Sequence, residues 1–583
     1  MSEAGARRRT DRETLVELAK RRGFFFQTSE PYGGVAGFYT FGPQGAALKH
    51  NLEAAWRERF TVAEGNHEIE APTIMPEPVF RASGHLDTFD DMLVECPACG
   101  ESHRADHLVE DYTDVEEAEA LPIEEIERIV RENDVGCPTC GTSLAGEPVV
   151  DFNLMFRTNI GPGESDPGYL RPETAQGIFA DFPRIKEYAR NTLPFGVTQI
   201  GPAYRNEISP RGGLLRLREL HQAELEQFVD PERDEPPIED VADVTLPLFS
   251  GERQERGEGH QELTVREAVE AGVVAEPWIA YFLGVAKRWY ERVGVDMERF
   301  RYRQHLPAEL SHYSSDCWDA EAEVHGDWIE LAGFAYRGDY DLSKHGAYAD
   351  DDFTVFRQYD EPVTVERPTV DPDMSHLGPE FGDRAEAVVE ALEDLAARDP
   401  DAFDGESVTV AVDDEEVSVP VAATGFTVEA VTEHGEHVTP HVVEPSFGVD
   451  RLVYTVLAHA HREDEVAGEP RTYLAMEPAV APTFVGVFPL RDDLADRATA
   501  LTDALRERGL AATYDDSGSI GRRYRRQDEV GTPFCVTLDE QTAADDTVTV
   551  RERDSTEQVR VALDELPGAL AAIRDGEASF DDL

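Results

Sequence analysis

Alternating polar and apolar positions are clearest between Gly196 and Val229, where the chain reads as two strands joined by a turn. The turn is Ser209-Pro210-Arg211-Gly212-Gly213, and both Pro and Gly favour chain reversal. Because successive strand residues point to opposite faces, Arg205 and Glu207 are predicted on one face of the first strand.

The return strand carries Glu224 and Glu226, again two residues apart, followed by Phe228. Carboxylates and arginines gathered on one face are costly to bury unless they bind something. The hairpin is therefore a candidate binding site. A solvated hairpin in an acidic protein would show the same pattern, since many sheets keep one polar face in water.

The other periodicities predict further helices and strands along the chain. Two acidic stretches that contain Pro and Gly, 231–260 and 360–439, are expected to be exposed insertions. The expected elements are helices at 11–26, 44–60, 264–294 and 385–397, strands at 67–80 and 325–342, and a strand, turn and helix at 437–460.

The pattern changes after Ala481. Strands and helices then alternate in a βαβαβ order, followed by two further strand-like segments within 547–561. This order predicts a small α/β domain with a largely parallel sheet. Its second helix holds four arginines, which form a possible footprint for a phosphate backbone, although a solvated helix face would look similar. They are Arg522, Arg523, Arg525 and Arg526.

Composition adds a constraint on the solvent. The 583 residues carry a formal net charge of −65, and only five of the 54 basic residues are lysines. A hydrophobic content of 40% argues against disorder. The balance is typical of a cytoplasmic protein from an extreme halophile, in which molar salt screens charges within about 3 Å. We expect no secretion signal and no membrane span, since apolar runs of about 18 residues are absent from the sequence.

Four of the six cysteines form two CPxCG segments, Cys96-Pro97-Ala98-Cys99-Gly100 and Cys137-Pro138-Thr139-Cys140-Gly141. Each tight turn aims two thiolates at one tetrahedral ion, which predicts a structural Zn²⁺ site. The 37 residues between the two segments make a longer gap than a usual zinc ribbon has. Two disulfides are the alternative, disfavoured here because no secretion signal is apparent.

The hairpin resembles motif 2 of class II aminoacyl-tRNA synthetases. Its sequence YRNEISPRGGLLRLREL is similar to that of the glycyl-tRNA synthetase family in its dimeric, archaeal and eukaryotic form. The helix and strand up to Pro72 or Pro76 resemble motif 1, which builds the dimer interface in that class. Gly448 and Arg451, where strand gives way to helix, resemble motif 3. The helix start offers N–H groups suited to phosphate, and a cation there opposes the helix dipole, which favours a functional role.

Three further phrases extend the resemblance over nearly the whole chain. They are RPETAQGIF from Arg171, RASGHL from Arg81 and RADH from Arg104. The segment SGSIGRRYRRQDEVGTPFCV resembles the anticodon-binding domain of the class. The resemblance implies an α+β fold in which an antiparallel sheet is flanked by helices, with a zinc-ribbon-like insertion and a C-terminal α/β anticodon-binding domain. Read locally, Glu173 in the first phrase could equally be an acidic group at a helix N-terminus.

The resemblance implies adenylate formation and transfer of glycine to the 3′ end of tRNA(Gly) by a homodimer, with ATP and Mg²⁺ as reactant and cofactor. Arg205 would hold the α-phosphate, Glu207 the adenine amino group, Arg451 the adenine and γ-phosphate, and Glu330 the Mg²⁺. The implied ATP-binding residues are Arg205, Asn206, Glu207, Leu215, Arg216, Leu217, Arg218, Glu219, Leu220, Glu330, Leu331, Gly448, Val449, Asp450 and Arg451.

Glycine has no side chain, so a site can select it only by gripping its ammonium and carboxylate and filling the space at its α-carbon. Carboxylates must therefore converge, with Ser446 beside the α-carbon and Arg104 at the carboxylate. The implied glycine-binding residues are Arg104, Glu173, Leu220, His221, Gln222, Ala223, Glu224, Glu444, Pro445, Ser446, Phe447 and Gly448.

The expected organisation is a catalytic core at 1–95, 151–230, 321–361 and 437–480, a zinc-binding insertion at 96–150, a partly helical insertion at 231–320, an acidic insertion at 362–436 and an anticodon-binding domain at 481–583. Two alternatives remain open. One is a class II synthetase for another small amino acid, and the other is a non-catalytic, synthetase-like tRNA-binding protein. Threonyl enzymes use mixed Cys/His zinc ligands, unlike this set of four cysteines.

Overall fold

A computed structural model describes residues 11–583 except 114, 116, 117, 119, 120, 163–165, 211, 308, 310–313, 413, 414 and 467. Arg211 of the predicted hairpin turn therefore lies outside the described residues. The chain forms two compact bodies, residues up to 353 together with 439–583, and residues 354–438.

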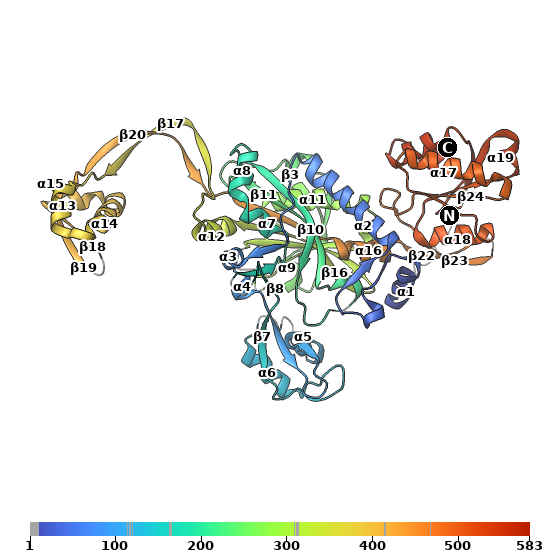
Figure 1. Cartoon of the computed structure of the whole chain (residues 1–583), viewed down its shortest axis with the longest axis horizontal. Helices are drawn as coiled ribbons and strands as arrows, with labels where there is room; N and C mark the ends of the chain where they lie inside the picture. Colours follow the sequence, from blue (N-terminus) through green and yellow to red (C-terminus); the bar gives the residue numbers. More distant parts are fainter. Residues whose placement is uncertain are drawn as a thin grey trace. The chain divides into compact units, whose positions relative to one another are not determined.

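A nine-stranded sheet is the centre of the first body (Figure 1). Its neighbouring strands are antiparallel except for the β12–β14 and β10–β3 pairs, which are parallel. The large antiparallel sheet predicted from the sequence is thereby confirmed. In spatial order the strands are β13 (Gln261–Thr264), β12 (Thr245–Phe249), β14 (Phe300–Gln304), β15 (Asp316–Val324), β16 (Asp327–Gly338), β21 (His441–Gly448), β11 (Glu219–Val229), β10 (Phe195–Tyr204) and β3 (His67–Glu68).

One face of this sheet carries the core. On β21 the ring of Phe447 packs against Trp56, Phe60 and Trp289, with ring centres 4.9–5.9 Å apart. These rings come from helices that cover this face: α2 (Pro43–Trp56), the π-helical turn η2 (Arg57–Ala63) and α11 (Pro277–Arg292). Helix α16 (Val449–Ala460) packs there too, and Leu452, Val453 and Leu457 belong to the same core.

Because strand residues alternate between faces, the positions next to the core residues point to the other side. Glu444 and Ser446 flank Val443 and Phe447 on β21, and Glu224 and Glu226 flank Leu225 on β11. The apolar packing of one face thus fixes a row of polar side chains on the opposite face.

The hairpin β10–β11 is present, with Phe195 opposite Phe228 and Tyr204 opposite Glu219. Strand β10 ends at Tyr204, however, so Arg205 and Glu207 lie beyond it, and the prediction that a strand places them on one face is wrong. The chain turns there because the Glu207 N–H donates to the Arg205 carbonyl at 2.7 Å, and the Asn206 N–H donates to Leu154 at 2.7 Å.

Three other sequence predictions need correction. The stretch 231–260 was expected to be an exposed loop, but it contains β12, whose Leu246 and Leu248 are fully buried. Pro247 in the middle of this strand hid it, because Pro lacks the N–H that a central strand requires. The helix expected at 264–294 is divided into α10 (Val265–Glu270) and α11.

The strand expected at 67–80 is also divided. It forms β3, then β4 (Ile74–Pro76) in a separate three-stranded sheet, and then α3 (Glu77–Ala82). The other strands of that sheet are β8 (Arg157–Asn159) and β9 (Pro167–Leu170), and β9 leads into α7 (Ala175–Ala180). This small sheet brings the RPETAQGIF segment beside the main one: the buried Arg171 donates to the carbonyls of Pro202 and Ala71.

The cysteine-containing segment forms its own three-stranded sheet with two helices. Its buried core includes Val94, Leu108 and Ile126 together with Cys96 and Cys137. The elements are β5 (Asp90–Glu95), β6 (Ser102–Arg104), β7 (Val149–Asn153), α5 (Ala105–Tyr112) and α6 (Ile123–Glu132).

The C-terminal domain is a five-stranded mixed sheet. Strands β25 (Ala512–Tyr514), β24 (Val485–Pro489) and β26 (Phe534–Leu538) are parallel, as predicted, whereas β27 (Thr547–Glu552) and β28 (Gln558–Ala562) are antiparallel to them or to each other. The helices are α17 (Ala495–Glu507), α18 (Ile520–Val530), α19 (Glu540–Asp545) and α20 (Leu566–Arg574).

The second body begins and ends in a two-stranded ribbon, β17 (Val355–Thr369) paired with β20 (Thr427–Val438) (Figure 1). The ribbon leads to a small core of α13 (Met374–Phe381), α14 (Ala385–Arg398), β18 (Ser407–Val412) and β19 (Glu415–Pro420). The predicted helix at 385–397 is present.

Candidate active site

A pocket opens on the polar face of the large sheet, between the end of the β10–β11 hairpin, strand β16 and the start of α16. Eleven of the residues implied for ATP line it: Arg205, Glu207, Leu215, Arg216, Leu217, Leu220, Glu330, Leu331, Gly448, Asp450 and Arg451. His221, Gln222 and Ser446, implied for glycine, line the same pocket, together with Leu214, which sequence reasoning missed.

Arg451 lies in the first turn of α16, which begins directly after β21 without the expected turn. Its Nη1 is 3.0 Å from both the carbonyl oxygen and Oε2 of Glu330, and its Nε donates to the Leu215 carbonyl at 3.1 Å. Desolvation in the pocket would raise the pKa of Glu330, but Arg451 and Arg205 outweigh it and hold the pKa below its usual value. A charged pair is thus ready at the pocket wall.

Arg205 leaves the end of β10 toward the same pocket. Its Nε donates to the Pro172 carbonyl at 3.1 Å, and its guanidinium lies 5.7 Å from the ring centre of Phe89. These contacts hold the Arg205 side chain in the pocket lining, and a planar guanidinium can donate two parallel hydrogen bonds to an anion.

Glu207 pairs with Arg216, whose Nε is 2.8 Å from Glu207 Oε2. Arg218 has a different position from the one expected for a nucleotide ligand. It donates to the backbone carbonyls of Glu207 and Ala36, at 3.0 and 3.1 Å, and so holds the loop in place. Asn206, Glu219 and Val449 likewise do not line the pocket, and their assignment to ATP stays a prediction.

Glu224 connects this pocket with a deeper group of carboxylates. Its Oε1 accepts from Ser446 Oγ at 2.5 Å and Gln222 Nε2 at 2.8 Å, and both partners also line the pocket. Its Oε2 accepts from Thr174 Oγ1 at 2.5 Å and from the Ala175 N–H at 2.6 Å. Burial, and then Glu173, raise the pKa of Glu224.

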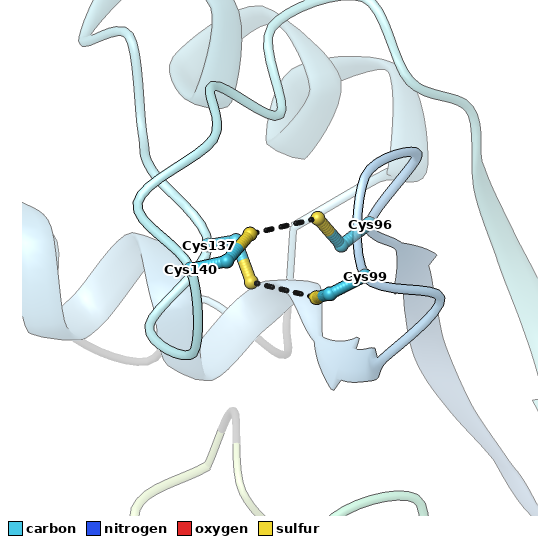
Figure 2. Close-up of side chains that lie close together, drawn as sticks. All are labelled: Cys96, Cys99, Cys137 and Cys140. Atoms are coloured by element: carbon cyan, nitrogen blue, oxygen red, sulfur yellow. Dashed lines mark hydrogen bonds between the residues drawn. The ribbon is translucent and has the colours of Figure 1, made fainter.

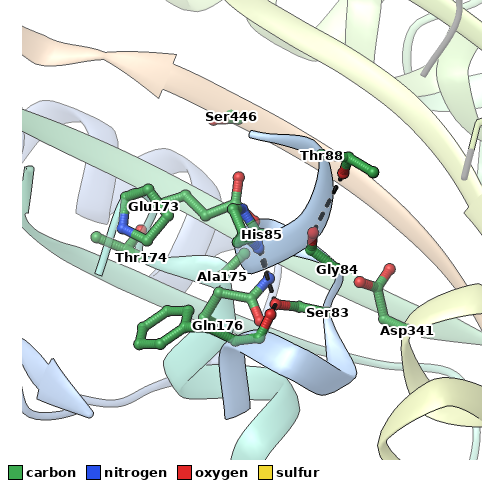
Figure 3. A network of polar contacts seen from close by, with 12 residues as sticks. Ser83, Gly84, His85, Thr88, Glu173, Thr174, Ala175, Gln176, Asp341 and Ser446 are labelled. Carbon is green, nitrogen blue, oxygen red and sulfur yellow. Dashed lines mark hydrogen bonds and ion pairs between the residues drawn. The ribbon is translucent and has the colours of Figure 1, made fainter. Parts of the chain in front are cut away.

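Glu173 and its partners are drawn in Figure 3. Glu173 Oε1 accepts from Gln176 Nε2 at 2.8 Å and lies 3.4 Å from His85 Nε2, and Ser83 holds the other ring nitrogen of His85 at 2.8 Å. Burial would raise the pKa of Glu173, but His85 outweighs it and holds the pKa below its usual value. His85 occurs in the RASGHL phrase, so the sequence did contain a signal for this partner.

Glu444 meets Arg337, whose Nη1 donates to Glu444 Oε2 at 2.8 Å. The same guanidinium makes a two-bond contact with Asp341, at 2.6 and 2.8 Å. All three side chains are buried. Neither Arg337 nor Asp341 was anticipated from the sequence, because the contacts join residues on β16, β21 and helix α12 (Tyr340–Tyr348).

Several other residues implied for glycine pack in the core or pair with other side chains. Phe447 faces the apolar core, and Ala223 and Pro445 point to the core side by strand alternation. Arg104 lies in the cysteine-containing domain, where its Nη1 is 3.0 Å from Asp91 and its Nε donates to Asp106 at 3.1 Å. Burial raises the pKa of Asp91, and Arg104 opposes the shift. Ser209 of the hairpin loop donates to the Ser102 carbonyl at 3.4 Å, which locates this domain beside the loop.

The four predicted zinc ligands come together (Figure 2). The Sγ atoms of Cys96 and Cys140 are 3.5 Å apart, and those of Cys99 and Cys137 are 3.7 Å apart. Four thiolates around Zn²⁺ at about 2.3 Å require separations of about 3.8 Å, so the set fits a tetrahedral zinc ion. Each CPxCG turn closes with the Gly N–H bonded to the first Cys carbonyl, and Gly100 and Gly141 have positive φ.

A second group of metal-type side chains is His305, Cys317 and Asp319 on the polar face of the sheet. His305 Nε2 is 2.8 Å from Asp319 Oδ2, and this contact, set against burial, raises the pKa of His305 to about 11. The pair is therefore explained as a charged histidine with its carboxylate.

The four arginines of α18 do not share one exposed surface. Arg523 is buried and donates to the carbonyls of Pro489, Asp516 and Gly518, so it supports the fold. Arg526 pairs with Asp515, with its Nε at 2.9 Å. Arg522 is exposed, and Arg525 is half-buried. These two are the members of the set best placed to meet a phosphate backbone.

Comparison with known proteins identifies the class to which this fold belongs. Residues 161–460 match the family model of the tRNA synthetase class II core domain (G, H, P, S and T), and residues 485–573 match that of the anticodon binding domain. A prolyl-tRNA synthetase from Cryptosporidium parvum, solved with L-proline and AMP, has the same fold, with a TM-score of 0.51, 10% identity, and 98% of this chain and 77% of that one covered. The fold and the pocket define a class II aminoacyl-tRNA synthetase.

Closer relatives specify the family. The chain is 48% identical to the glycine–tRNA ligase of Methanothrix thermoacetophila, with 98% of each protein covered. It is 46% identical to that of Archaeoglobus fulgidus, with 97% of each covered, and 45% identical to that of Methanocaldococcus jannaschii, with 95% of this chain and 97% of the relative covered. The chain belongs to the glycine–tRNA ligase family.

Proposed function

We propose that this protein activates glycine with ATP, forming glycyl-adenylate and pyrophosphate, and then transfers glycine to the 3′ end of tRNA(Gly). One observation carries the proposal: Ser446 and Gln222 line the pocket of Arg205 and Arg451 and also donate to Glu224. A nucleotide site and a carboxylate-lined amino-acid site are therefore continuous, as attack of a carboxylate on the α-phosphate requires.

In this mechanism Arg205 neutralises charge on the α-phosphate, and Arg451 binds the adenine and the γ-phosphate. Arg451 and Glu330 are already paired at 3.0 Å, so nucleotide binding exchanges one charged partner of Arg451 for another. Glu330 would hold Mg²⁺, which supplies charge neutralisation on the phosphates when bound. Glu207 accepts from the adenine amino group.

Glu173, Glu224 and Glu444 receive the ammonium of glycine, and Ser446 leaves no room for a side chain at the α-carbon. Discrimination by bulk is effective against larger amino acids, so the protein needs no editing site by this logic. Arg104 is proposed for the glycine carboxylate, which requires it to exchange Asp91 or Asp106 for the substrate.

We further propose a homodimer, consistent with exposed apolar side chains on the motif 1 segments, where Val62 is 70% and Ile74 is 48% exposed. The cysteine set is proposed to hold a closed, structural Zn²⁺, and Arg522 and Arg525 to contact tRNA. The acidic composition supports a cytoplasmic protein of a halophile, and the described helices include none with the length and apolar character of a membrane span.

Charging of tRNA(Gly) with labelled glycine, in high KCl, tests the complete reaction. The proposal predicts glycine esterified to tRNA(Gly) and no charging of a tRNA(Pro) control. A folded preparation that charges neither tRNA with glycine would contradict it.

A further inference from the structure

Five carboxyl groups gather beside the proposed glycine site, far more than the nearby cations can neutralise. They are Glu173, Glu224, Glu226, Glu444 and Asp341, and the nearby cations are Arg337, Arg171 and, when protonated, His85. His345 on α12 is also buried there, and burial lowers its pKa to about 4, which keeps it neutral. This excess of buried carboxyls over cations favours a proton on at least one of the five.

Hydrogen-bond donors distinguish the five groups. Glu224 receives four donors, Asp341 receives two from Arg337, Glu444 receives one from Arg337, and Glu173 receives one from Gln176 with His85 close by. Glu226 is fully buried, and among the described residues neither of its oxygens has a hydrogen-bond partner. An ionised carboxylate without donors is the costliest state a buried carboxyl can adopt.

The strand register identifies the neighbour of Glu226. Glu224 is opposite Ser446 and Gln227 is opposite Val443, so the same register places Glu226 opposite Glu444. Like charges directly across an antiparallel pair repel each other. Arg337 supports the ionised form of Glu444 at 2.8 Å, whereas no donor within the described structure supports an ionised Glu226.

Resting on the function proposed above, we propose that Glu226 is a positioning residue of the glycine site: it is held as the neutral acid and donates its O–H to Glu444, so that Glu444 is the member of the pair that ionises toward the substrate's ammonium. Glu226 itself does not touch the substrate. It keeps the site from carrying two adjacent negative charges, and it orients the one carboxylate that binds.

The electrostatics of the pair agree with this order. Burial raises the pKa of both groups, to about 8 for Glu444, where Arg337 opposes the shift, and well above its usual value for Glu226. Glu224 on the same strand and Asp341 on α12 raise the pKa of Glu226 further, and Arg337 lowers it. Two interacting groups titrate as a pair, and the donors decide where the first proton is held.

Two substitutions separate the proposal from a merely structural role. Glu226→Met introduces a neutral side chain of similar length that cannot donate a hydrogen bond. We expect this variant to raise the KM for glycine about fivefold to tenfold, which is the effect of one lost hydrogen bond. Its KM for ATP should be unchanged. Glu226→Gln is neutral and can donate, so it should restore the KM to within about threefold of the wild type. Glycine-dependent pyrophosphate exchange measures both.

Glu444→Gln is the matched control on the opposite strand, and it should raise the KM for glycine about a hundredfold, because it removes the ionised partner. A Glu226→Gln variant as impaired as Glu444→Gln would overturn the proposal, since it would show that Glu226 acts as an anion. An unaffected Glu226→Met variant would overturn it too, since no positioning contact would then exist.

A measurement that does not depend on activity tests the protonation of Glu226 directly. It also distinguishes a failure of this proposal from a failure of the proposed function. The infrared difference spectrum of the wild type minus Glu226→Gln, recorded at neutral pH without substrate, should contain the carbonyl stretch of a protonated carboxyl. Its absence would overturn the proposal even if glycine is activated. Its presence in a protein that does not activate glycine would leave the protonated Glu226 standing and reject the function instead.

Discussion

Arg451 Nη1 lies 3.0 Å from Glu330 Oε2 and 3.0 Å from the Glu330 backbone carbonyl. The contact joins α16 to β16 at the wall of the pocket. Both side chains are partly exposed to the pocket, so water screens the pair and either member can change partner. This relationship links the proposed phosphate ligand to the proposed Mg²⁺ ligand.

Replacing Arg451 with Ala should therefore reduce kcat/KM for ATP in pyrophosphate exchange about a hundredfold or more, the effect of removing a donor to a developing phosphate charge. Circular dichroism should change little, because the side chain is a third exposed and not part of the core. Arg184→Ala is the control, since Arg184 is exposed and pairs with Glu187 on the same helix, α8 (Phe182–Tyr188). Equal activities of the two variants would refute the role of Arg451.

The cysteine cluster predicts about one zinc ion per chain. Cys137→Ser should lose it, loosen the domain that carries Arg104, and raise the KM for glycine. Metal analysis and limited proteolysis measure the two effects. Cys317→Ser is the control and should keep its zinc, because Cys317 lies outside the cluster. Unchanged zinc content and kinetics in Cys137→Ser would defeat the assignment.

Glycine binding should depend on pH through Glu444. Because burial raises the pKa of this carboxyl to about 8, the free protein holds a proton there at neutral pH, and the ammonium displaces it. Binding that releases a proton strengthens as pH rises, so the Kd for glycine should fall toward pH 8 and level off above it. Calorimetry in buffers of different ionisation enthalpy measures the released proton.

The control for this titration is Glu444→Gln, in which the proton release should disappear and the remaining weak binding should be independent of pH over the same range. Proton uptake on binding, or a Kd that rises with pH in the wild type, would contradict the assignment.

The net charge of −65 predicts a need for salt. In dilute buffer the unscreened repulsion should unfold the chain or dissociate the proposed dimer, whereas molar KCl screens charges within about 3 Å. Circular dichroism and size-exclusion chromatography along a KCl series test this expectation. A protein that stays folded and dimeric in dilute buffer would show that the halophile interpretation is wrong.

The sequence predicted most of what depends on local pattern. The alternation of Glu224 with Leu225, and of Ser446 with Phe447, follows from one core-facing and one polar face of a sheet, and the structure shows both. The convergence of two thiols within each CPxCG segment follows from its tight turn. The resemblance supplied the order of the motifs, which composition could not.

What the sequence did not predict depends on contacts between distant segments. Glu226 and Glu224 read alike in the sequence, since both lie on one face of one strand. Only the register that brings Ser446 on β21 opposite Glu224, and the approach of Thr174 and Ala175, complete the four donors of Glu224, whereas Glu226 has none among the described residues. Likewise, the sequence did not distinguish the buried Arg523 from the other arginines of α18, because the carbonyls that accept its hydrogen bonds come from other segments.

The most direct test of the account is amino-acid-dependent exchange of pyrophosphate into ATP, measured in high KCl with glycine, alanine, serine, threonine and proline in turn. The account predicts exchange with glycine alone. Exchange with a different amino acid would keep the class II chemistry and contradict the pocket assignment. No exchange with any of the five, in a folded sample, would contradict the proposed activation step itself.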